Sequence, residues 1–259
     1  MKRTIQFLLL ATVAGAAFAG NFTLCSTGFA SATTSGCGAS INSPLANNLT
    51  ADGNWYVASN SSGTFLSQAF VTINNSYPVA NGGPWLANNA NDSNGVGSGS
   101  SWITPGNNQA ATYVNGPQYF ATQFSLAGYA ASTAQVSGFW LADDYGGGIF
   151  LNGVQVGQSS LPAFGGLGGP MVPFNITQGN PVMGQAVFTG GQNTLTFGVV
   201  NDSTNHGTQL GGNTPTGVRV LFTSATASSS PSATPEPGTM LLMGAGLIGL
   251  GVLARRRLA

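Results

Sequence analysis

Residues 149–156 read Ile-Phe-Leu-Asn-Gly-Val-Gln-Val and are the strongest local indication of fold in this chain. Asn152 and Gly153 stand between two apolar runs. Both residue types tolerate a positive φ, which a two-residue type I′ turn between antiparallel strands requires. The stretch therefore predicts a tight β-hairpin.

Runs on both sides of this hairpin predict more strands. Within residues 193–200 apolar side chains alternate with threonines, as they do in a strand with one buried face. The same alternation in residues 218–222 predicts that Arg219 lies on the outer face or at an edge. Trp140, inside another such run, is expected in the core. The remaining predicted strands are residues 54–58, 69–73, 110–114, 118–126, 134–142 and 182–188.

The segments between these runs favour turns and loops. Residues 143–148 read Asp-Asp-Tyr-Gly-Gly-Gly, which is unlike a regular strand, and residues 88–101 are nearly all Asn, Ser and Gly, as in a surface loop. No long helical period occurs between residues 20 and 234. Little charge and many aromatic residues argue against a disordered chain. The expected class is all-β, a two-sheet jelly-roll β-sandwich of roughly eight strands.

The amino terminus has the layout of a secretory signal. Lys2 and Arg3 precede an apolar run at residues 5–18, and small residues at Ala17 and Ala19 predict cleavage after Ala19. The alternative is a membrane anchor, for which the run is short against a hydrocarbon core of ~30 Å.

The carboxyl terminus predicts a single membrane helix. Residues 238–254 carry no charge and would reach roughly 25 Å as a helix. Arg255, Arg256 and Arg257 follow and favour the cytoplasmic side. Pro235-Glu236-Pro237 precedes the span, and its two prolines hold the backbone extended and accessible.

These three parts in this order resemble a PEP-CTERM sorting signal. The resemblance implies an exported bacterial protein that is anchored in the inner membrane, cut at the motif by an exosortase-like transpeptidase, and then carried to the surface or released. It also implies the export machinery as a partner and an association with exopolysaccharide. The expected domains are a signal peptide at 1–19, a β-sandwich at 20–223, a linker at 224–234 and the sorting signal at 235–259.

Charge excludes one class of partner. Between residues 20 and 234 the chain has one basic residue, Arg219, and five aspartates, which give a net charge of about −4. Binding to nucleic acid depends on several phosphate contacts from Lys or Arg. We therefore expect no nucleic-acid partner.

Cys25 and Cys37 are the only two cysteines of the chain. In an exported protein such a pair predicts a disulfide that closes a short loop near the mature amino terminus. Two free thiols are the alternative. Two cysteines and the single, distant His206 do not make a zinc site.

A second resemblance concerns the body of the chain. Its motifs recur in this order in many PEP-CTERM exoproteins, whose bodies are similar to the galactose-binding-like jelly rolls of carbohydrate-binding modules. Sugar binding follows only by analogy of fold. The motifs are Asp52-Gly-Asn54-Trp55, Pro84-Trp85-Leu86-Ala87, Trp102-Ile103-Thr104-Pro105, residues 139–153, Asn193-Thr-Leu195-Thr-Phe197 and Thr216-Gly217-Val218-Arg219-Val220.

Two neighbouring aspartates are candidates for metal binding or acid–base chemistry. Asp143 and Asp144 are the only adjacent pair, and the glycines that follow favour a turn. Such a turn can hold a structural calcium ion, or the aspartates can simply accept backbone hydrogen bonds. No serine–histidine–acid constellation is identifiable, and His206 lies in a polar loop, so we expect no catalytic residues.

Aromatic side chains are the remaining candidates for ligand contact, because sugar rings pack their C–H surfaces on aromatic faces. Most tryptophans in a sandwich are core residues. The candidate ligand-binding residues are Tyr145, Trp55, Trp85 and Trp102.

The sequence therefore favours an exported, non-catalytic surface or matrix protein with extracellular polysaccharide as its expected ligand. No cofactor is expected other than the calcium ion. The alternatives are a secreted carbohydrate-active hydrolase that uses Asp143 or Asp144, and an adhesin for ice or another surface.

Overall fold

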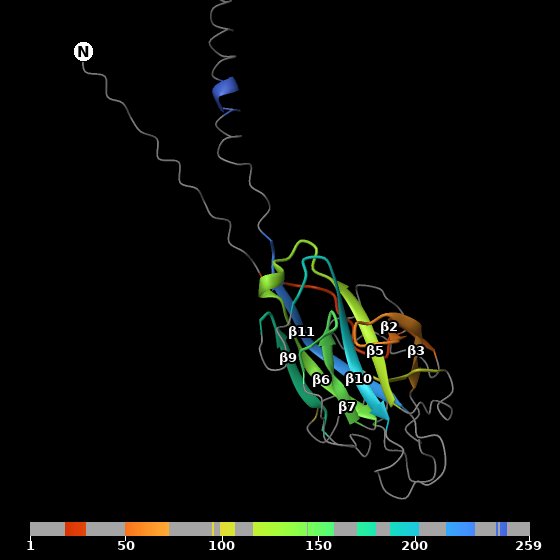
Figure 1. Ribbon diagram of the computed structural model, residues 1–259. Coiled ribbons are helices and arrows are strands. Elements are labelled where there is room, and N and C mark those ends of the chain that lie inside the picture. The colour runs from red at the N-terminus through yellow and green to blue at the C-terminus, as the bar shows by residue number, and fades with distance from the viewer. Residues whose placement is uncertain are drawn as a thin grey trace, which may run out of the picture. The chain divides into compact units, whose positions relative to one another are not determined.

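The computed structural model describes the residues drawn in colour in Figure 1. The chain divides into two units that are treated separately below: residues 19–228, and residues 1–18 with 229–259. The described residues are 19–29, 50–72, 95, 99–106, 116–143, 145–157, 170–179, 187–201, 216–230, 242 and 244–247.

The larger unit is built of antiparallel strands, which confirms the all-β prediction. A short 3-10 turn, η2 (Ala131–Thr133), is its described helical element. The strands are β1 (Ala19–Asn21), β2 (Ala51–Ala58), β3 (Phe65–Thr72), β4 (Trp102–Thr104), β5 (Gly116–Ser125), β6 (Gln135–Asp143), β7 (Tyr145–Leu151), β8 (Val154–Gln155), β9 (Val172–Thr177), β10 (Gln192–Asn201) and β11 (Gly217–Ser228).

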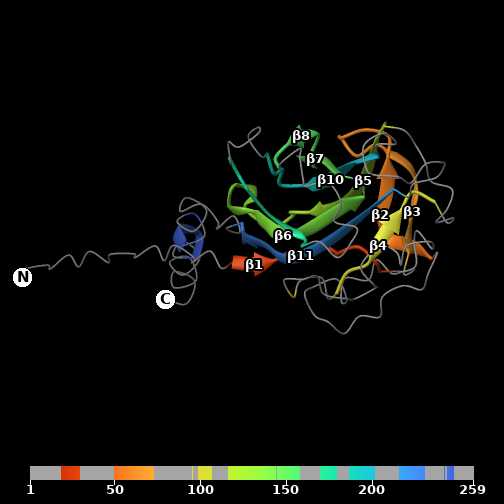
Figure 2. The same ribbon diagram turned by 90° about the horizontal axis from the view of Figure 1, so that it is seen from below.

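These strands form one continuously paired sheet in the order β8-β7-β10-β5-β2-β3-β4-β11-β6-β9, and β1 pairs with β11. The sheet bends at β2, β3 and β4 so that two layers face each other (Figure 2). Across the layers, the rings of Trp140 in β6 and Phe197 in β10 lie 5.3 Å apart. The expected two-layer architecture thus arises from a single folded sheet.

The core lies between the two layers. Leu195, Phe197 and Val199 of β10 are fully buried, as their alternation predicts, and Trp140 is a core residue. Burial of alternate apolar side chains from both layers is the main source of stability in such a fold.

The predicted hairpin is confirmed. Leu151 pairs with Val154, and the turn residues Asn152 and Gly153 have φ values of 51° and 85°. The Asn152 side chain links the turn to β10, the neighbour of β7 in the sheet, because its Oδ1 accepts a hydrogen bond of 2.8 Å from the Thr194 backbone N–H.

The prediction that residues 143–148 form a turn is wrong. Asp143 ends β6, and Tyr145 begins β7, which pairs with β10. The register shifts between Gly198 and Val199 of β10. Gly148, beside this irregularity, has a φ of 124°, a backbone conformation that residues other than glycine rarely adopt.

Other strands differ from the prediction. The strand β9 was not predicted. Val187 and Phe188, which belong to the strand predicted at 182–188, lie outside any strand. Ser100 and Ser101 of the predicted surface loop are fully buried. Residues 182–186 and 110–114 lie outside the described residues.

β11 extends to Ser228, although residues 224–228 were predicted as linker. The small side chains of residues 224–228 fit into the sheet here. Ala227 is buried, and β1 pairs with this part of β11 so that Ala19 lies opposite Ser228. The bond after Ala19, the predicted cleavage point, therefore lies within β1.

Arg219 lies on the face of β11 that points away from the main core, as predicted, but this face is not open to solvent. A second apolar cluster of Trp102, Leu141 and Met171 covers it. Arg219 is fully buried, and its Nε donates to Ser100 Oγ at 2.9 Å.

In the smaller unit, residues 242 and 244–247 are helical. Among the described residues, which include only these five of the predicted span at 238–254, no helix has the length and apolarity needed to cross a membrane.

Candidate functional site

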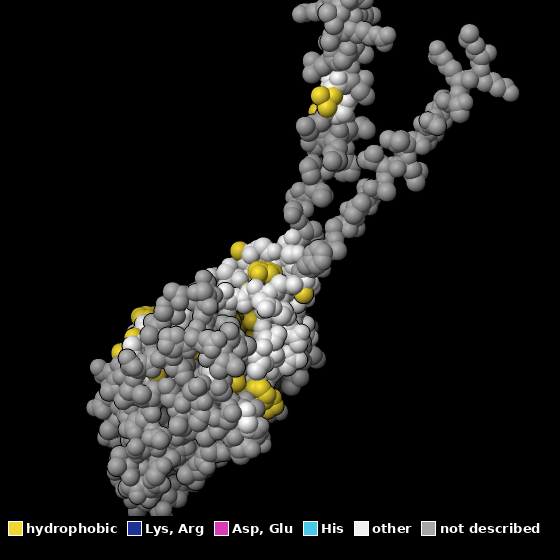
Figure 3. All heavy atoms as spheres, turned by 180° about the vertical axis from the view of Figure 1, so that it is seen from behind, with side chains coloured by type: hydrophobic (Ala, Val, Ile, Leu, Met, Phe, Trp, Pro, Cys, Tyr) yellow, Lys and Arg dark blue, Asp and Glu magenta, His cyan; other side chains and the backbone are white. Residues whose placement is uncertain are grey.

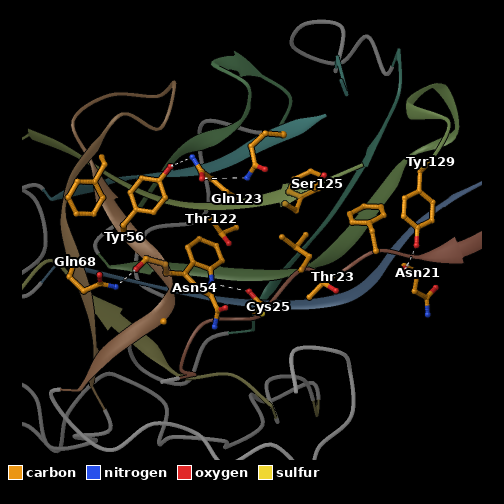
Figure 4. Close-up of a pocket in the computed structure, with 17 residues that line it drawn as sticks. Asn21, Thr23, Cys25, Asn54, Tyr56, Gln68, Thr122, Gln123, Ser125 and Tyr129 are labelled. Carbon is orange, nitrogen blue, oxygen red and sulfur yellow. Dashed lines mark hydrogen bonds between the residues drawn. The ribbon is translucent and has the colours of Figure 1, made fainter. Parts of the chain in front are cut away.

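A groove of about 630 Å³ opens in the larger unit beside β5 (Figure 4). It lies where the pairing of β5 with its two neighbours differs in length. β10 pairs with β5 as far as Ser125, whereas β2 pairs with β5 only up to Thr122, opposite Trp55. In the earlier part of β2, Ala51 pairs with Phe70 of β3. Residues 21–25 form the wall across the resulting gap.

Core contacts hold this amino-terminal wall in place. The ring of Phe22 stacks on Phe124 at 5.1 Å, and the Trp55 indole Nε1 donates to the Cys25 carbonyl at 2.9 Å. Cys25 is disulfide-bonded, and Cys37, the partner that the sequence predicts, lies outside the described residues. The wall is thus anchored by packing, a hydrogen bond and a covalent bridge.

A row of polar side chains crosses the outer edge of the groove. Gln192 Nε2 donates to Gln123 Oε1 at 3.5 Å, and Gln123 Nε2 donates to Tyr56 Oη at 3.4 Å. The Tyr56 hydroxyl in turn donates to the Gly63 carbonyl at 2.7 Å. Burial raises the pKa of Tyr56, so its phenol stays protonated at neutral pH. We call Tyr56, Gln123 and Gln192 the amide–phenol row.

Aromatic side chains stand at both ends of the groove. At one end, Phe65 is 63% exposed and its ring lies 5.6 Å from that of Tyr56. At the other end, Tyr129 Oη donates to the Asn21 carbonyl at 2.9 Å, and Figure 4 shows Tyr56 and Tyr129 far apart along the groove. The hydrogen bonds of both tyrosines fix their positions before any ligand binds.

The described lining contains no charged side chain. Its polar groups are the amides of Asn21, Asn54, Gln68, Gln123 and Gln192 and the hydroxyls of Thr23, Thr122, Ser125, Tyr56 and Tyr129. The neutral character extends to the side of the molecule shown in Figure 3, where no charged side chain is visible among the described residues.

Asp52 lies directly behind the groove and was not predicted as important beyond its motif. Its side chain is fully buried and accepts hydrogen bonds from the backbone N–H groups of Gly28 at 2.7 Å and Asn54 at 2.9 Å. Burial raises the pKa of Asp52 to about 7, and the N–H donors oppose that increase. The available signal was the aspartate itself, because Asp side chains often accept a hydrogen bond from the backbone N–H two residues on.

Of the predicted ligand-binding aromatics, the two whose side chains the structure describes, Trp55 and Trp102, lie in different apolar clusters. Trp55 is 1% exposed and packs on Phe197 and Phe222, so it is a core residue that forms only the floor of the groove. Trp102 is equally buried, in the second cluster. Tryptophans at these positions fill the interior, so Trp55 reaches the groove only through its floor and Trp102 does not line it. Ligand contact by either residue stays a prediction. Trp85 and the side chain of Tyr145 lie outside the described residues.

Asp143 is also buried, at the end of β6 opposite Gly217, and Asp144 lies outside the described residues. In the described part of the chain no three His, Cys, Asp or Glu side chains are grouped as metal ligands. Calcium binding stays a prediction.

Comparison with known proteins identifies the carboxyl terminus. Residues 233–257 match the family described as the PEP-CTERM protein-sorting motif. This motif indicates an exported protein with a membrane-anchored precursor that an exosortase-like enzyme processes. No curated protein and no solved structure matches the chain.

Proposed function

We propose that this chain is an exported, non-catalytic surface or matrix protein that an exosortase-type transpeptidase sorts at Pro235-Glu236-Pro237. Its folded body then binds extracellular polysaccharide. The observation that carries this proposal is the sorting motif at residues 233–257, attached to a body with an uncharged groove.

The groove supports binding rather than turnover. Hydrolysis of a glycosidic bond generally needs two carboxyl groups placed on either side of the scissile bond. The described lining holds no carboxyl group and no imidazole. Asp143, the candidate acid of the hydrolase alternative, is 3% exposed and is not among the groove residues. No observation favours that alternative or an adhesin for ice.

Alanine replacement of Pro235, Glu236 and Pro237 tests the sorting step. We expect the variant to accumulate in the inner membrane as unprocessed chain, because the accessible motif is removed while the apolar span is kept. The measurement is immunoblotting of membrane, surface and medium fractions from cells that produce the full chain.

The matched control replaces three residues just upstream of the matched motif, Ser230, Pro231 and Ser232, by alanine. This control is expected to be processed like the unaltered chain. Unchanged processing of the Pro235-Glu236-Pro237 variant would refute sorting at this motif.

A further inference from the structure

We infer that the groove beside β5 binds an uncharged, polyhydroxylated sugar chain laid along it between Tyr56 and Tyr129. This inference rests on the proposed function and assigns a site and a ligand class to it. The assignment comes from the charge, hydrogen-bonding groups and shape of the groove.

The charge of the lining selects the ligand class. A carboxylated or sulfated chain would leave its anions without a cationic partner in this groove, and desolvated charges need such partners. Arg219, the one basic residue between residues 20 and 234, is fully buried against Ser100 and is not part of the lining. An uncharged ligand avoids that cost.

The polar groups suit hydroxyls in particular. Amide side chains offer a donor and an acceptor on the same group, and a sugar hydroxyl is likewise both. Gln123 and Gln192 of the amide–phenol row are exposed on neighbouring strands and lie within reach of each other. Gln68 adds an acceptor, its Oε1, because its Nε2 already donates to the backbone carbonyls of Asp52 and Trp55.

Aromatic carbon at both ends suits the apolar faces of sugar rings. The exposed Phe65 ring beside Tyr56 serves one end, and Tyr129 serves the other. A volume of about 630 Å³ lies within the range of roughly 300–1,000 Å³ that is usual for small-ligand sites. Because hydrogen bonds already hold both tyrosines, little ordering is required on binding.

Binding is tested on the full chain purified in mild detergent. The probes are neutral dextran, laminarin and galactomannan, with alginate and polygalacturonate as acidic probes, and retardation in affinity gels followed by titration calorimetry is the measurement. We expect binding to at least one neutral probe and none to the acidic probes.

Two substitutions locate the site, each with a matched control. Phe65→Ala and Gln123→Ala are each expected to weaken binding by roughly three- to tenfold, the loss of one ring or amide contact. Leu66→Ala is the control for the first, since Leu66 is 61% exposed next to Phe65 but does not line the groove. Gln118→Ala is the control for the second, on the same strand outside the groove.

The outcomes separate this inference from the proposed function. Failure to bind any neutral probe, binding of acidic probes alone, or equal affinity in the Phe65 and Gln123 variants and their controls would each overturn the inference. Unfolding midpoints of the four variants exclude misfolding as the cause. If the chain is sorted normally but binds no neutral probe, only the assignment of a sugar site to the groove is refuted. If the chain binds a neutral probe but its processing does not depend on Pro235-Glu236-Pro237, only the sorting proposal is refuted.

Discussion

At the scale of single residues, the charged side chains that the structure describes in this body are buried. Arg219 and Asp52 are both fully buried, and backbone or hydroxyl groups bind each of them. Asp52 connects residues 28 and 54, so a single carboxyl group joins the amino-terminal segment to the strand behind the groove. Burial of a carboxyl group is costly, and these backbone hydrogen bonds offset part of that cost.

Stability is predicted to fall as the pH rises from about 4 to 8. Asp52 has a pKa of about 7 in the folded chain and 3.8 as its ordinary value, so the folded state binds the proton more tightly. Its stabilising contribution is complete below about pH 4 and is lost as the pH rises through 7, by roughly 4 kcal/mol at most. Chemical denaturation across this range measures the loss.

Asp52→Asn keeps the size of the side chain but cannot titrate. We expect this variant to be less stable than the unaltered chain at acidic pH, because the new amide NH2 group faces a backbone N–H donor. Its free energy of unfolding should change little with pH. Asp92→Asn is the control for the change in net charge. An equal pH dependence in Asp52→Asn and the unaltered chain would contradict the role assigned to Asp52.

At the scale of elements, the pairing of β6 with β11 leaves no room for a side chain beside its irregularity. The register between these strands shifts between Phe222 and Ser224, and Gly138 stands opposite Phe222. A Cβ atom on Gly138 would collide with the Leu221 carbonyl oxygen and lie 2.9 Å from the Phe174 ring. The pairing of these two strands therefore depends on the absence of a side chain.

Gly138→Ala is predicted to destabilise the fold by roughly 1–3 kcal/mol, because the backbone of β11 has to move. Ser137→Ala is its neighbour and control, with an expected effect within about 0.5 kcal/mol. Urea unfolding of both variants measures the difference. Equal stabilities would show that β6 and β11 separate more easily than this contact implies.

At the scale of the whole folded unit, the two ends of the chain segment 19–228 meet. Ala19 pairs with Ser228, and Gly20 pairs with Ala227. Cleavage after Ala19 would leave Gly20 and Asn21 in place on β11, directly before the segment that leads to the sorting motif. Residues 21–25 continue from there into the groove wall, so the predicted cleavage would place the new amino terminus next to the site.

The disulfide at Cys25 is predicted to stabilise this wall. Closing a short loop contributes about 3 kcal/mol. Reductant should lower the thermal midpoint of the unaltered chain to that of the Cys25→Ser, Cys37→Ser double variant, and should leave the double variant unchanged. A midpoint that does not respond to reductant, or two reactive thiols in the oxidised protein, would disprove the bridge.

The sequence alone predicted the features that depend on neighbouring residues. The Asn152-Gly153 hairpin, the alternation of β10 and the sorting motif at 233–257 are each contained in one short stretch, and each was recognised. Backbone preference and side-chain period act locally, so they can be read without knowing the fold.

The tertiary structure alone decided the site and the burial of charge. The groove combines residues 21–25, β2, β3, β5, Tyr129 and β10, which are far apart in sequence. Arg219 and Trp102 are buried because other segments cover them, and the strand pattern specifies only which face a side chain takes. Whether that face meets water, another segment or a ligand depends on how distant parts of the chain pack together.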